Sequence, residues 1–325
     1  MQNLFSSTVV VGAGAVGSFY GAMLARAGQR VTLIAREAHV AAIQRQGLLL
    51  NMAGQQHAID VQATTSLEPL RSADLVLVCV KSTDTASVAA DMAPLLRPDA
   101  LVLSLQNGVE NAATLASHLA APVIPTVVYV ATGMTAPGHV THHGRGELVI
   151  GPRTAAQAQD PALMQRLAAV VAHFAPAQIG VSISNQVMEA LWQKLLINCA
   201  YNAISALTQQ PYGVMAQQPG LQAFQQAIVN EVLAVAQAEG LALDAQAMWA
   251  ATAQIAVSMA TQRSSTAQDL ARGKPTEIDH LNGFVARRGA ALGVATPMNQ
   301  AVWALVKLAE TSGWRPQALK AGTAG

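Results

Sequence analysis

The stretch Thr8-Val9-Val10-Val11-Gly12-Ala13-Gly14-Ala15-Val16-Gly17 joins a run of apolar, mostly β-branched residues to a glycine-rich turn. Residues 18–27, which follow it, have the composition of a helix. In a strand–turn–helix unit, the first glycine permits a tight turn, the second lets the backbone approach phosphates, and the third lets the helix pack on the strand. The helix N-terminus then faces the anion. We therefore predict that Gly12 to Gly17 binds the pyrophosphate of a dinucleotide.

The length and composition are those of an ordinary soluble enzyme. A chain of 325 residues with 52% hydrophobic residues is long enough for two hydrophobic cores. The net charge of +1, with 11% charged residues and no cluster of Lys and Arg, argues against a nucleic-acid partner. No apolar run reaches the roughly 18 residues of a membrane helix, so no membrane association is expected.

The two cysteines favour a reducing compartment. Cys79 lies in an apolar run and Cys199 in an amphipathic stretch. We interpret both as small buried hydrophobic residues rather than as a disulfide or metal ligands. The N-terminus has no basic region ahead of its apolar residues, so no secretory signal is expected and the predicted location is cytoplasmic.

Strand and helix patterns alternate along the first half of the chain. Strands are predicted at 8–11, 30–34, 74–80 and 101–105, a hairpin around 48–59, and helices at 18–27, 37–46 and before Pro98. Strands separated by helices imply a right-handed, parallel, doubly wound sheet. The glycine-interrupted region 123–150 predicts antiparallel hairpins that finish this sheet, and a helix at 161–174 and a strand at 178–182 close the domain.

After about residue 185 the strand signal ends. Long segments rich in Ala and Leu predict helices at 186–207, 219–239, 244–261, 276–292 and 297–311, and residues 320–325 are predicted to be a frayed tail. The expected α/β fold has an N-terminal Rossmann-type domain, 1–184, that binds NADP, and an all-helical C-terminal domain, 185–325, that carries substrate and catalytic groups. The Ala-rich helices are compatible with a homodimer.

Arg36 indicates the cofactor. In this fold an acidic residue at the end of the second strand binds the adenosine ribose hydroxyls of NAD, whereas a basic residue can pair with the 2′-phosphate of NADP. The second strand here ends in Ala35-Arg36, and no Asp or Glu precedes Arg36 in it. We predict NADPH/NADP, although Arg36 could also be a solvated surface residue.

Lys81 and Asn107 follow two further predicted strands. Residues just past the carboxyl ends of parallel strands line the ligand crevice of such a sheet. Both side chains are therefore candidates to contact the cofactor or its reacting partner. A solvated loop charge at Lys81 and a plain turn at Asn107-Gly108 remain the alternatives.

Lys194, Asn198 and Asn202 form the most informative polar pattern of the second half. On a helix, residues four apart lie about 40° from one another, so the three side chains make one narrow stripe among apolar neighbours. Such a stripe must face water or a ligand, because unpaired buried amides and ammonium groups are costly. A protonated Lys194 can donate its proton to a carbonyl oxygen as hydride reaches the carbon, while the amides hold the substrate. The alternative is an ordinary exposed stripe, for which two mid-helix Asn residues are a poor choice.

A second polar cluster covers residues 263–266 and 273–283. Thr276 or Pro275 could start a helix whose first turn contains Glu277 and Asp279, which would suit the helix dipole. From its residues alone this cluster can be either a helix cap or part of a site.

In combination, these residues resemble the ketopantoate reductase (2-dehydropantoate 2-reductase) family over nearly the whole chain. The motifs that carry the resemblance are GAGAVG at 12–17, Ala35-Arg36, Val80-Lys81-Ser82, Gln106-Asn107-Gly108, Lys194-x3-Asn198-x3-Asn202, Ser264-Ser265, and Thr276-Glu277-Ile278-Asp279 followed by Asn282-Gly283. Each motif alone is weak, but all of them in this order, with the family's spacing through the helical domain, are specific.

The resemblance implies NADPH-dependent reduction of the 2-oxo group of ketopantoate to pantoate, on the route to pantothenate and coenzyme A. It implies that Lys194 is the proton donor. The substrate ligands that it implies are Asn198, Asn202 and Ser265, with Asn107 between substrate and nicotinamide. The NADPH contacts that it implies are the 12–17 turn, Arg36, Lys81, Asn107 and Glu277, with Ala131 as a further candidate.

Two positions depart from the family pattern and leave the substrate open. Tyr212 stands where some members have a substrate-contacting Asn, and Thr266 replaces the Met that often follows the paired serines. A reductase of another 2-oxo or β-hydroxy acid is the nearest alternative, but β-hydroxyacid dehydrogenases usually carry a Ser-Gly-Gly loop where this chain has Gln106-Asn107-Gly108. A non-catalytic NADP(H) sensor would not need Lys194 and both Asn residues of the stripe.

No metal site is expected. His139, His142 and His143 lie close together in the sequence, but no acidic or Cys partner lies nearby at ligand spacing. Hydride transfer to a 2-oxo acid with a lysine as acid requires no metal ion.

Overall fold

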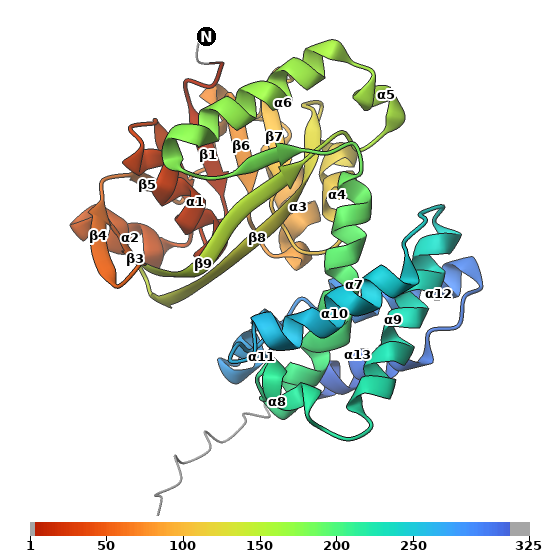
Figure 1. Cartoon of the computed structure of the whole chain (residues 1–325). Coiled ribbons are helices and arrows are strands. Elements are labelled where there is room, and N and C mark those ends of the chain that lie inside the picture. The colour runs from red at the N-terminus through yellow and green to blue at the C-terminus, as the bar shows by residue number, and fades with distance from the viewer. Residues whose placement is uncertain (1–3, 313–325) are drawn as a thin grey trace, which may run out of the picture. The chain divides into compact units, whose positions relative to one another are not determined.

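The computed structural model describes residues 4–312 and divides into two compact units, 1–191 and 192–325. The predicted tail at 320–325 lies outside the described residues. Figure 1 shows that the strands belong to the first unit and that the second unit is built of helices. The predicted fold class, a doubly wound α/β domain followed by a helical domain, is confirmed.

The first unit contains a mixed sheet with helices on both faces. Its strands are β1 (Thr8–Val11), β2 (Val31–Ile34), β3 (Leu48–Met52), β4 (Gln55–Ile59), β5 (Gln62–Thr64), β6 (Leu75–Val78), β7 (Leu101–Ser104), β8 (Val123–Ala136), β9 (His139–Ile150) and β10 (Val181–Ile183). Its helices are α1 (Ala15–Arg26), α2 (Glu37–Gln46), α3 (Thr85–Met92), α4 (Asn111–His118), α5 (Ala155–Ala158) and α6 (Pro161–Phe174), with short 3-10 turns η1 (Glu68–Ser72), η2 (Ser82–Asp84) and η3 (Ala175–Ala177).

The strand order is β4-β3-β9-β8-β7-β6-β1-β2-β5, and β10 pairs with β9. All neighbours from β8 through β5 are parallel. Strand β9 pairs antiparallel with β8, and β3 and β4 form the hairpin predicted around 48–59. Because β1 lies between the parallel strands β2 and β6, the turn after it is flanked on both sides at the sheet's carboxyl edge, where ligands bind in this architecture.

Strand β1 illustrates why the central strands are continuous apolar runs. Val10 packs with α1 and α6 in a core that includes Phe19 and Phe174. Val9 and Val11 point to the opposite face, where the core includes residues of α3 and α4 such as Met92. Successive side chains therefore enter two different cores, which is why Val9, Val10 and Val11 are all apolar.

The region 123–150 pairs antiparallel as predicted, but its strands are longer than the short pieces that the glycines indicated. It forms one long two-stranded hairpin, β8 and β9, whose register shifts near Tyr129/Val130 and Ala131/Thr132. The glycines in β9 do not end the strand. Gly144, Arg145 and Gly146 take positive φ values where the register with β8 shifts. Such bulges absorb an extra residue and bend a strand without terminating it.

The second unit contains helices and no strand among its described residues. Its elements are α7 (Val187–Thr208), which begins in the first unit, α8 (Tyr212–Ala216), α9 (Leu221–Ala238), α10 (Ala245–Ser258), α11 (Ser265–Ala271), η4 (Ile278–His280), α12 (Asn282–Leu292) and α13 (Pro297–Thr311). Within residues 4–312, no helix has both the length and the apolar character needed to cross a membrane.

The helix predicted at 276–292 is shorter than expected. The Thr276 hydroxyl accepts a hydrogen bond from the Ile278 N–H, two residues on. This hydrogen bond forms a short turn and does not begin the helix. The Asp279 carboxylate is held instead by Trp303 Nε1 at 2.7 Å and by Lys307 Nζ at 2.9 Å, both on α13. Leu281 then breaks the helical path with φ −113° and ψ −106°, so the helix itself starts at Asn282.

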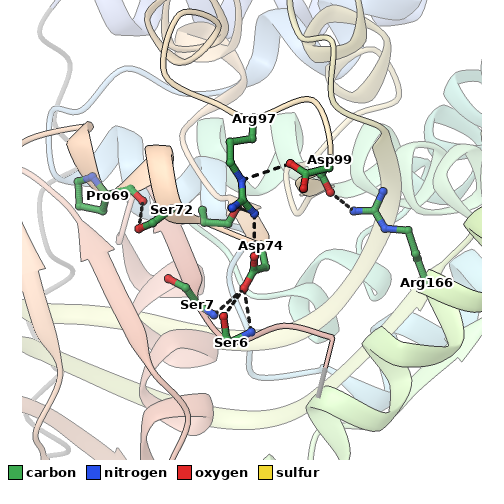
Figure 2. Close-up of polar contacts among 9 residues, drawn as sticks. Ser6, Ser7, Pro69, Ser72, Asp74, Arg97, Asp99 and Arg166 are labelled. Atoms are coloured by element: carbon green, nitrogen blue, oxygen red, sulfur yellow. Dashed lines mark hydrogen bonds and ion pairs between the residues drawn. The ribbon is translucent and has the colours of Figure 1, made fainter. Parts of the chain in front are cut away.

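A polar cluster ties together the amino ends of the central strands. Asp74, just before β6, accepts hydrogen bonds from Ser6 and Ser7, which precede β1, and from Arg97 Nη2 at 2.8 Å (Figure 2). Arg97 Nε lies 3.2 Å from Asp99, whose carbonyl accepts a hydrogen bond from Arg166 of α6. Burial alone would raise the pKa of Asp74, but the hydrogen bonds from Ser6, Arg97 and Ser7 outweigh it and hold this pKa below its usual value.

Asp74→Ala is expected to lower the free energy of unfolding by about 2 kcal/mol at neutral pH, because it removes the common acceptor of these donors. The pKa of Asp74 is lower in the folded state, so its carboxylate stabilises the fold above the unfolded-state pKa of about 3.9. This contribution is lost as the pH falls through the folded-state pKa. Denaturant unfolding from pH 7 into the acid range measures both effects.

The matched control is Glu68→Gln. Glu68 pairs with Arg71 at 2.8 Å, but the two side chains are 64% and 59% exposed, so the change should stay within about 0.5 kcal/mol. An equal loss in both variants, or a loss in Asp74→Ala that persists unchanged in acid, would contradict the role assigned to Asp74.

Candidate functional site

The glycine turn is held against the ends of two neighbouring strands. The N–H groups of Gly12 and Ala13 both donate to the carbonyl of Ile34, the last residue of β2, at 3.0 and 2.9 Å. Gly12 has φ +87°, and a Cβ built on it would lie 2.6 Å from the backbone nitrogen of Val80. Glycine is therefore required at residue 12 both by the backbone conformation and by the close approach of the chain that follows β6.

The other two glycines of the turn differ in what surrounds them. A Cβ on Gly17 would lie 2.8 Å from the Gly12 carbonyl oxygen and 2.9 Å from Val10, so this glycine lets α1 pack on β1. A Cβ on Gly14 would meet no protein atom closer than the Gly12 oxygen at 4.0 Å. Among the described residues, no contact requires a glycine at residue 14, whereas a phosphate approaching the backbone would.

Helix α1 begins beside this open position. Gly14 is its N-cap and supplies no side-chain hydrogen bond, and the first turn contains no acidic residue. The N–H groups of a first helical turn have no acceptor within the helix and carry the positive end of the helix dipole. The turn and helix thus fit the pyrophosphate of a dinucleotide.

Arg36 lies next to this turn, at the carboxyl end of β2. It is the N-cap residue of α2, two residues after Ile34, and its side chain is exposed. Within the described part of the chain, its guanidinium makes no hydrogen bond or ion pair. Arg36 is thus placed where the adenosine end of a dinucleotide lies in folds of this type.

Lys81 and Asn107 lie on the same edge, after β6 and β7. Lys81 is half-buried and directly follows Val80, the residue against which Gly12 packs. Asn107 is joined to the segment after β6 because its carbonyl accepts a hydrogen bond from Ser82 Oγ at 2.9 Å. The structure therefore brings the glycine turn, Arg36, Lys81 and Asn107 to one edge of the sheet.

A buried polar network beneath Asn107 was not anticipated from the sequence. Asn111 Nδ2 donates to the Asn107 carbonyl at 2.6 Å and to Ser82 Oγ at 3.1 Å. Asn111 Oδ1 accepts from Thr85, whose hydroxyl accepts from Gln106 Nε2 at 2.6 Å. All four side chains are buried, but each has at least one polar neighbour in the sequence, so no local pattern marks them as members of a network.

Ala131 lies further along β8 than the other candidates of the first unit. It is half-buried, pairs with Gly144 of β9, and lies at a register shift of the hairpin. Strand β7 pairs with β8 only from Val123 to Pro125, so Ala131 is on the part of β8 that continues beyond the end of β7. The described contacts do not connect it with the glycine turn.

The predicted polar stripe lies on α7. Lys194 and Asn198 are half-buried, and Asn202 is buried at 4% exposure, while Leu195, Cys199 and other neighbours are fully covered. The stripe is therefore not the exposed face of a surface helix, which was the alternative interpretation. Of its three residues, Asn202 is the most buried.

Ser264 and Ser265 start α11 beside the Asn202 end of this stripe. Ser264 Oγ donates to the Asn202 carbonyl at 3.2 Å and also caps α11 by accepting from the Ala267 N–H. Ser265 is the first residue of α11 and is exposed. The two serines thus have different environments, because Ser264 is a buried cap and Ser265 is available to a ligand.

Two buried asparagines connect α7 to the rest of the helical unit. Asn282 Nδ2 donates to the Cys199 carbonyl at 3.1 Å and to Asn299 Oδ1 at 2.9 Å. Asn299 Nδ2 donates to Glu231 of α9 at 2.7 Å. The contribution of Asn299 and Glu231 was missed, although an Asn within the apolar face of α13 could have indicated it.

Glu277 lies at the start of η4 and is half-buried. Its neighbours on both sides are anchored to α13, since the Thr276 N–H donates to Glu310 at 2.7 Å and Asp279 bonds Trp303 and Lys307. Burial alone would raise the pKa of Asp279, but the hydrogen bonds from Lys307 and Trp303 outweigh it and lower that pKa. Glu277 and Asp279 therefore differ in role, because Asp279 anchors the turn to α13.

The two residues that depart from the family pattern are both in the core. Tyr212 is 8% exposed, and its ring centroid lies 4.8 Å from that of Tyr201. Thr266 is buried in the first turn of α11. Both departures therefore lie at positions that pack within the helical unit.

Cys79 and Cys199 are both free thiols. Among the described residues, no group of three or more His, Cys, Asp and Glu side chains has an arrangement suited to a metal ion. Of the predicted histidine group, His142 stacks on Phe19 with ring centroids 4.5 Å apart, and His139 contacts Gln46.

Comparison with known proteins gives a consistent result along the chain. One family model, described as ketopantoate reductase PanE/ApbA, matches residues 8–155, and a second, for the C-terminal part of the same family, matches 186–310. The 2-dehydropantoate 2-reductase of Halobacterium salinarum is 34% identical over 94% of this chain and 99% of its own length. The 2-dehydropantoate 2-reductase of Vibrio cholerae is 31% identical, with 94% and 98% covered.

Solved structures agree with this result. A PanE/ApbA family ketopantoate reductase from Ralstonia eutropha is 51% identical and superimposes with a TM-score of 0.87, covering 94% of this chain and 99% of its own. A D-mandelate dehydrogenase, solved with NADH and anilino(oxo)acetate, has the same TM-score of 0.87 and the same coverage but only 23% identity. The second likeness indicates a shared fold.

Gly12→Ala and Gly14→Ala form a matched pair that tests the turn. Gly12→Ala should lower the free energy of unfolding by at least about 3 kcal/mol, because its Cβ collides with the Val80 backbone at a positive φ. Gly14→Ala should change it by no more than about 1 kcal/mol, the difference between Gly and Ala at an N-cap. Denaturant unfolding of both variants measures the contrast, and similar losses in the two would show that the turn is described wrongly.

Proposed function

The chain belongs to the ketopantoate reductase family, and we propose that it reduces the 2-oxo group of ketopantoate to the hydroxyl of pantoate with NADPH. The observation that carries this proposal is that two sets of polar groups occur in one chain. The first unit has an open glycine turn for a dinucleotide, and α7 of the second unit has the stripe from Lys194 to Asn202.

In the proposed reaction, bound NADPH supplies a hydride to the carbonyl carbon. As the C=O π bond breaks, the oxygen gains negative charge, and Lys194 donates a proton from Nζ to it. The products are the 2-hydroxy acid, NADP⁺ and a neutral lysine that takes a proton back from solvent. A half-buried ammonium group suits this role, because reduced solvation strengthens its interaction with a developing anion.

We assign substrate binding to Asn198, Asn202 and Ser265. The amide and hydroxyl groups can donate hydrogen bonds to a carboxylate and accept them from a hydroxyl. The hydrogen bond from Ser264 to the Asn202 carbonyl supports this assignment, since it joins the start of α11 to the stripe. Fixed donors orient the substrate without reorganising during the reaction.

We assign cofactor binding to the 12–17 turn, Arg36, Lys81 and Asn107, with Glu277 and Ala131 as further contacts. The network of Ser82 and Asn111 supports a positioning role for the segment at Asn107, because it holds the Asn107 carbonyl and so fixes the backbone that follows β7. Glu277 belongs to the second unit, so its assignment rests on the family motif and on the anchoring of its neighbours to α13.

A reductase of a different 2-oxo acid is the second candidate. Tyr212 and Thr266 differ from the family pattern, and both are packed in the helical unit that carries the assigned substrate ligands. A change in packing there can alter which side chain of a 2-oxo acid is accepted. NADPH oxidation should therefore be measured with ketopantoate and with a panel of aliphatic and aromatic 2-oxo acids.

Lys194→Ala should reduce kcat by roughly a hundredfold or more, because the proton donor is lost. NADPH binding, measured by the fluorescence of the reduced nicotinamide, should change little. Lys274→Ala is the matched control, since Lys274 is an exposed lysine of the same unit. Full activity of Lys194→Ala, or no turnover of any oxo acid by the unaltered protein, would refute the mechanism.

Arg36→Ala should raise the Kd of NADPH roughly tenfold to a hundredfold, the effect expected for lost hydrogen bonds between a guanidinium and a phosphate. The Kd of NADH should stay nearly constant, because NADH lacks the 2′-phosphate. Arg45→Ala, at the other end of α2, serves as control. A preference of the unaltered protein for NADH, or an equal effect of Arg36→Ala on both cofactors, would contradict this role.

A further inference from the structure

His39 is a buried histidine on α2 with both ring nitrogens in hydrogen bonds. The residue is 5% exposed. Nδ1 lies 2.8 Å from the backbone nitrogen of Gly138, in the turn between β8 and β9, and Nε2 lies 3.0 Å from Ser18 Oγ on α1. One side chain therefore joins three segments that are far apart in the sequence.

The direction of these hydrogen bonds follows from the backbone groups at the two ends. A backbone N–H can only donate, so Nδ1 of His39 must accept from Gly138 and the neutral ring must carry its proton on Nε2. That proton is donated to Ser18 Oγ, whose own hydrogen is then directed to the Ala13 carbonyl at 3.1 Å. Burial lowers the pKa of His39 and so favours the neutral ring that this series of hydrogen bonds requires.

Both ends of this series of hydrogen bonds, Gly138 and Ala13, are fixed by further contacts. The Gly138 carbonyl accepts from the Leu49 N–H of β3 at 2.8 Å, and a Cβ on Gly138 would lie 2.8 Å from Ala42 of α2, so this turn is packed tightly. At the other end, the Ala13 N–H is held by Ile34 and its carbonyl by Ser18. Both peptide groups that flank Ala13 therefore have set orientations, directly before the open position at Gly14.

We propose that His39 is a positioning residue of the dinucleotide site: through Ser18 it fixes the Ala13 carbonyl and thereby the orientation of the glycine turn that receives the pyrophosphate. The proposal rests on the proposed function only in requiring that the turn binds a dinucleotide. His39 touches neither the cofactor nor the substrate in this role, so its loss weakens cofactor binding rather than the chemical step.

Two conservative variants separate this role from a purely structural one. The amide nitrogen of His39→Gln reaches the place of Nε2 and can donate to Ser18, while the bond to Gly138 is lost. The amide oxygen of His39→Asn reaches the place of Nδ1 and can accept from Gly138, while the bond to Ser18 is lost. Each variant loses one neutral hydrogen bond, so both should be destabilised to a similar extent.

The Kd of NADPH is measured by fluorescence titration, together with the steady-state constants and the unfolding transition of each variant. We expect His39→Asn and Ser18→Ala to raise the Kd about tenfold. His39→Gln should stay within about twofold of the unaltered protein, and kcat at saturating NADPH should be nearly constant in all three. The double variant with Ser18→Ala and His39→Asn should bind no worse than Ser18→Ala alone, because both changes interrupt one chain.

Equal Kd values for His39→Gln and His39→Asn, whether raised or unaltered, would overturn the proposal, since a structural role would make affinity follow stability alone. Additive effects in the double variant would also overturn it. Failure of the unaltered protein to bind either NADPH or NADH would instead refute the proposed function. Cofactor binding by the unaltered protein is therefore measured before any variant is compared.

Discussion

The backbone after β6 lies so close to Gly12 that no side chain fits between them. The same glycine, with Ala13, donates to the last carbonyl of β2, so the turn is fixed from both neighbouring strands. The three strand ends can meet in this way only because β1 lies between β2 and β6 in a parallel sheet. The open position at Gly14, the start of α1 and the place of Lys81 all depend on this close approach.

Buried hydrogen-bond networks hold the backbone at the functional positions. Asn111 and Ser82 hold the carbonyl of Asn107, Ser264 holds that of Asn202, and His39 acts on that of Ala13 through Ser18. In each case a polar group within the core bonds to a main-chain carbonyl, so the neighbouring side chain or turn keeps a defined orientation. Since a buried donor without a partner is costly, such networks also make the local backbone conformation unique.

Patterns that depend on neighbours along the chain were predicted well. The β1 run, the helix at 37–46 and the helix at 161–174 follow from periodicity and flanking residues, and they match β1, α2 and α6. The antiparallel pairing of region 123–150 was predicted correctly, but its strands are longer than predicted, because a glycine signals a break locally whereas β9 absorbs Gly144 and Gly146 in bulges. The late start of α12 likewise depends on contacts of Asp279 with α13, which no local pattern contains.

By itself, the sequence determined the α/β fold class, the dinucleotide turn and the polar stripe on α7, because each depends on the order and spacing of residues within one segment. Only the tertiary structure decided which glycine faces open space, that Ser264 is a cap while Ser265 is exposed, and that Ser18, Asn111 and Asn282 donate to backbone carbonyls. The physical reason is that packing distances and hydrogen-bond partners are set by segments distant in the chain. Residues 12 and 14 are both glycine, yet a Cβ on Gly12 would collide with the backbone of Val80, whereas a Cβ on Gly14 would come no closer than 4.0 Å to the Gly12 oxygen.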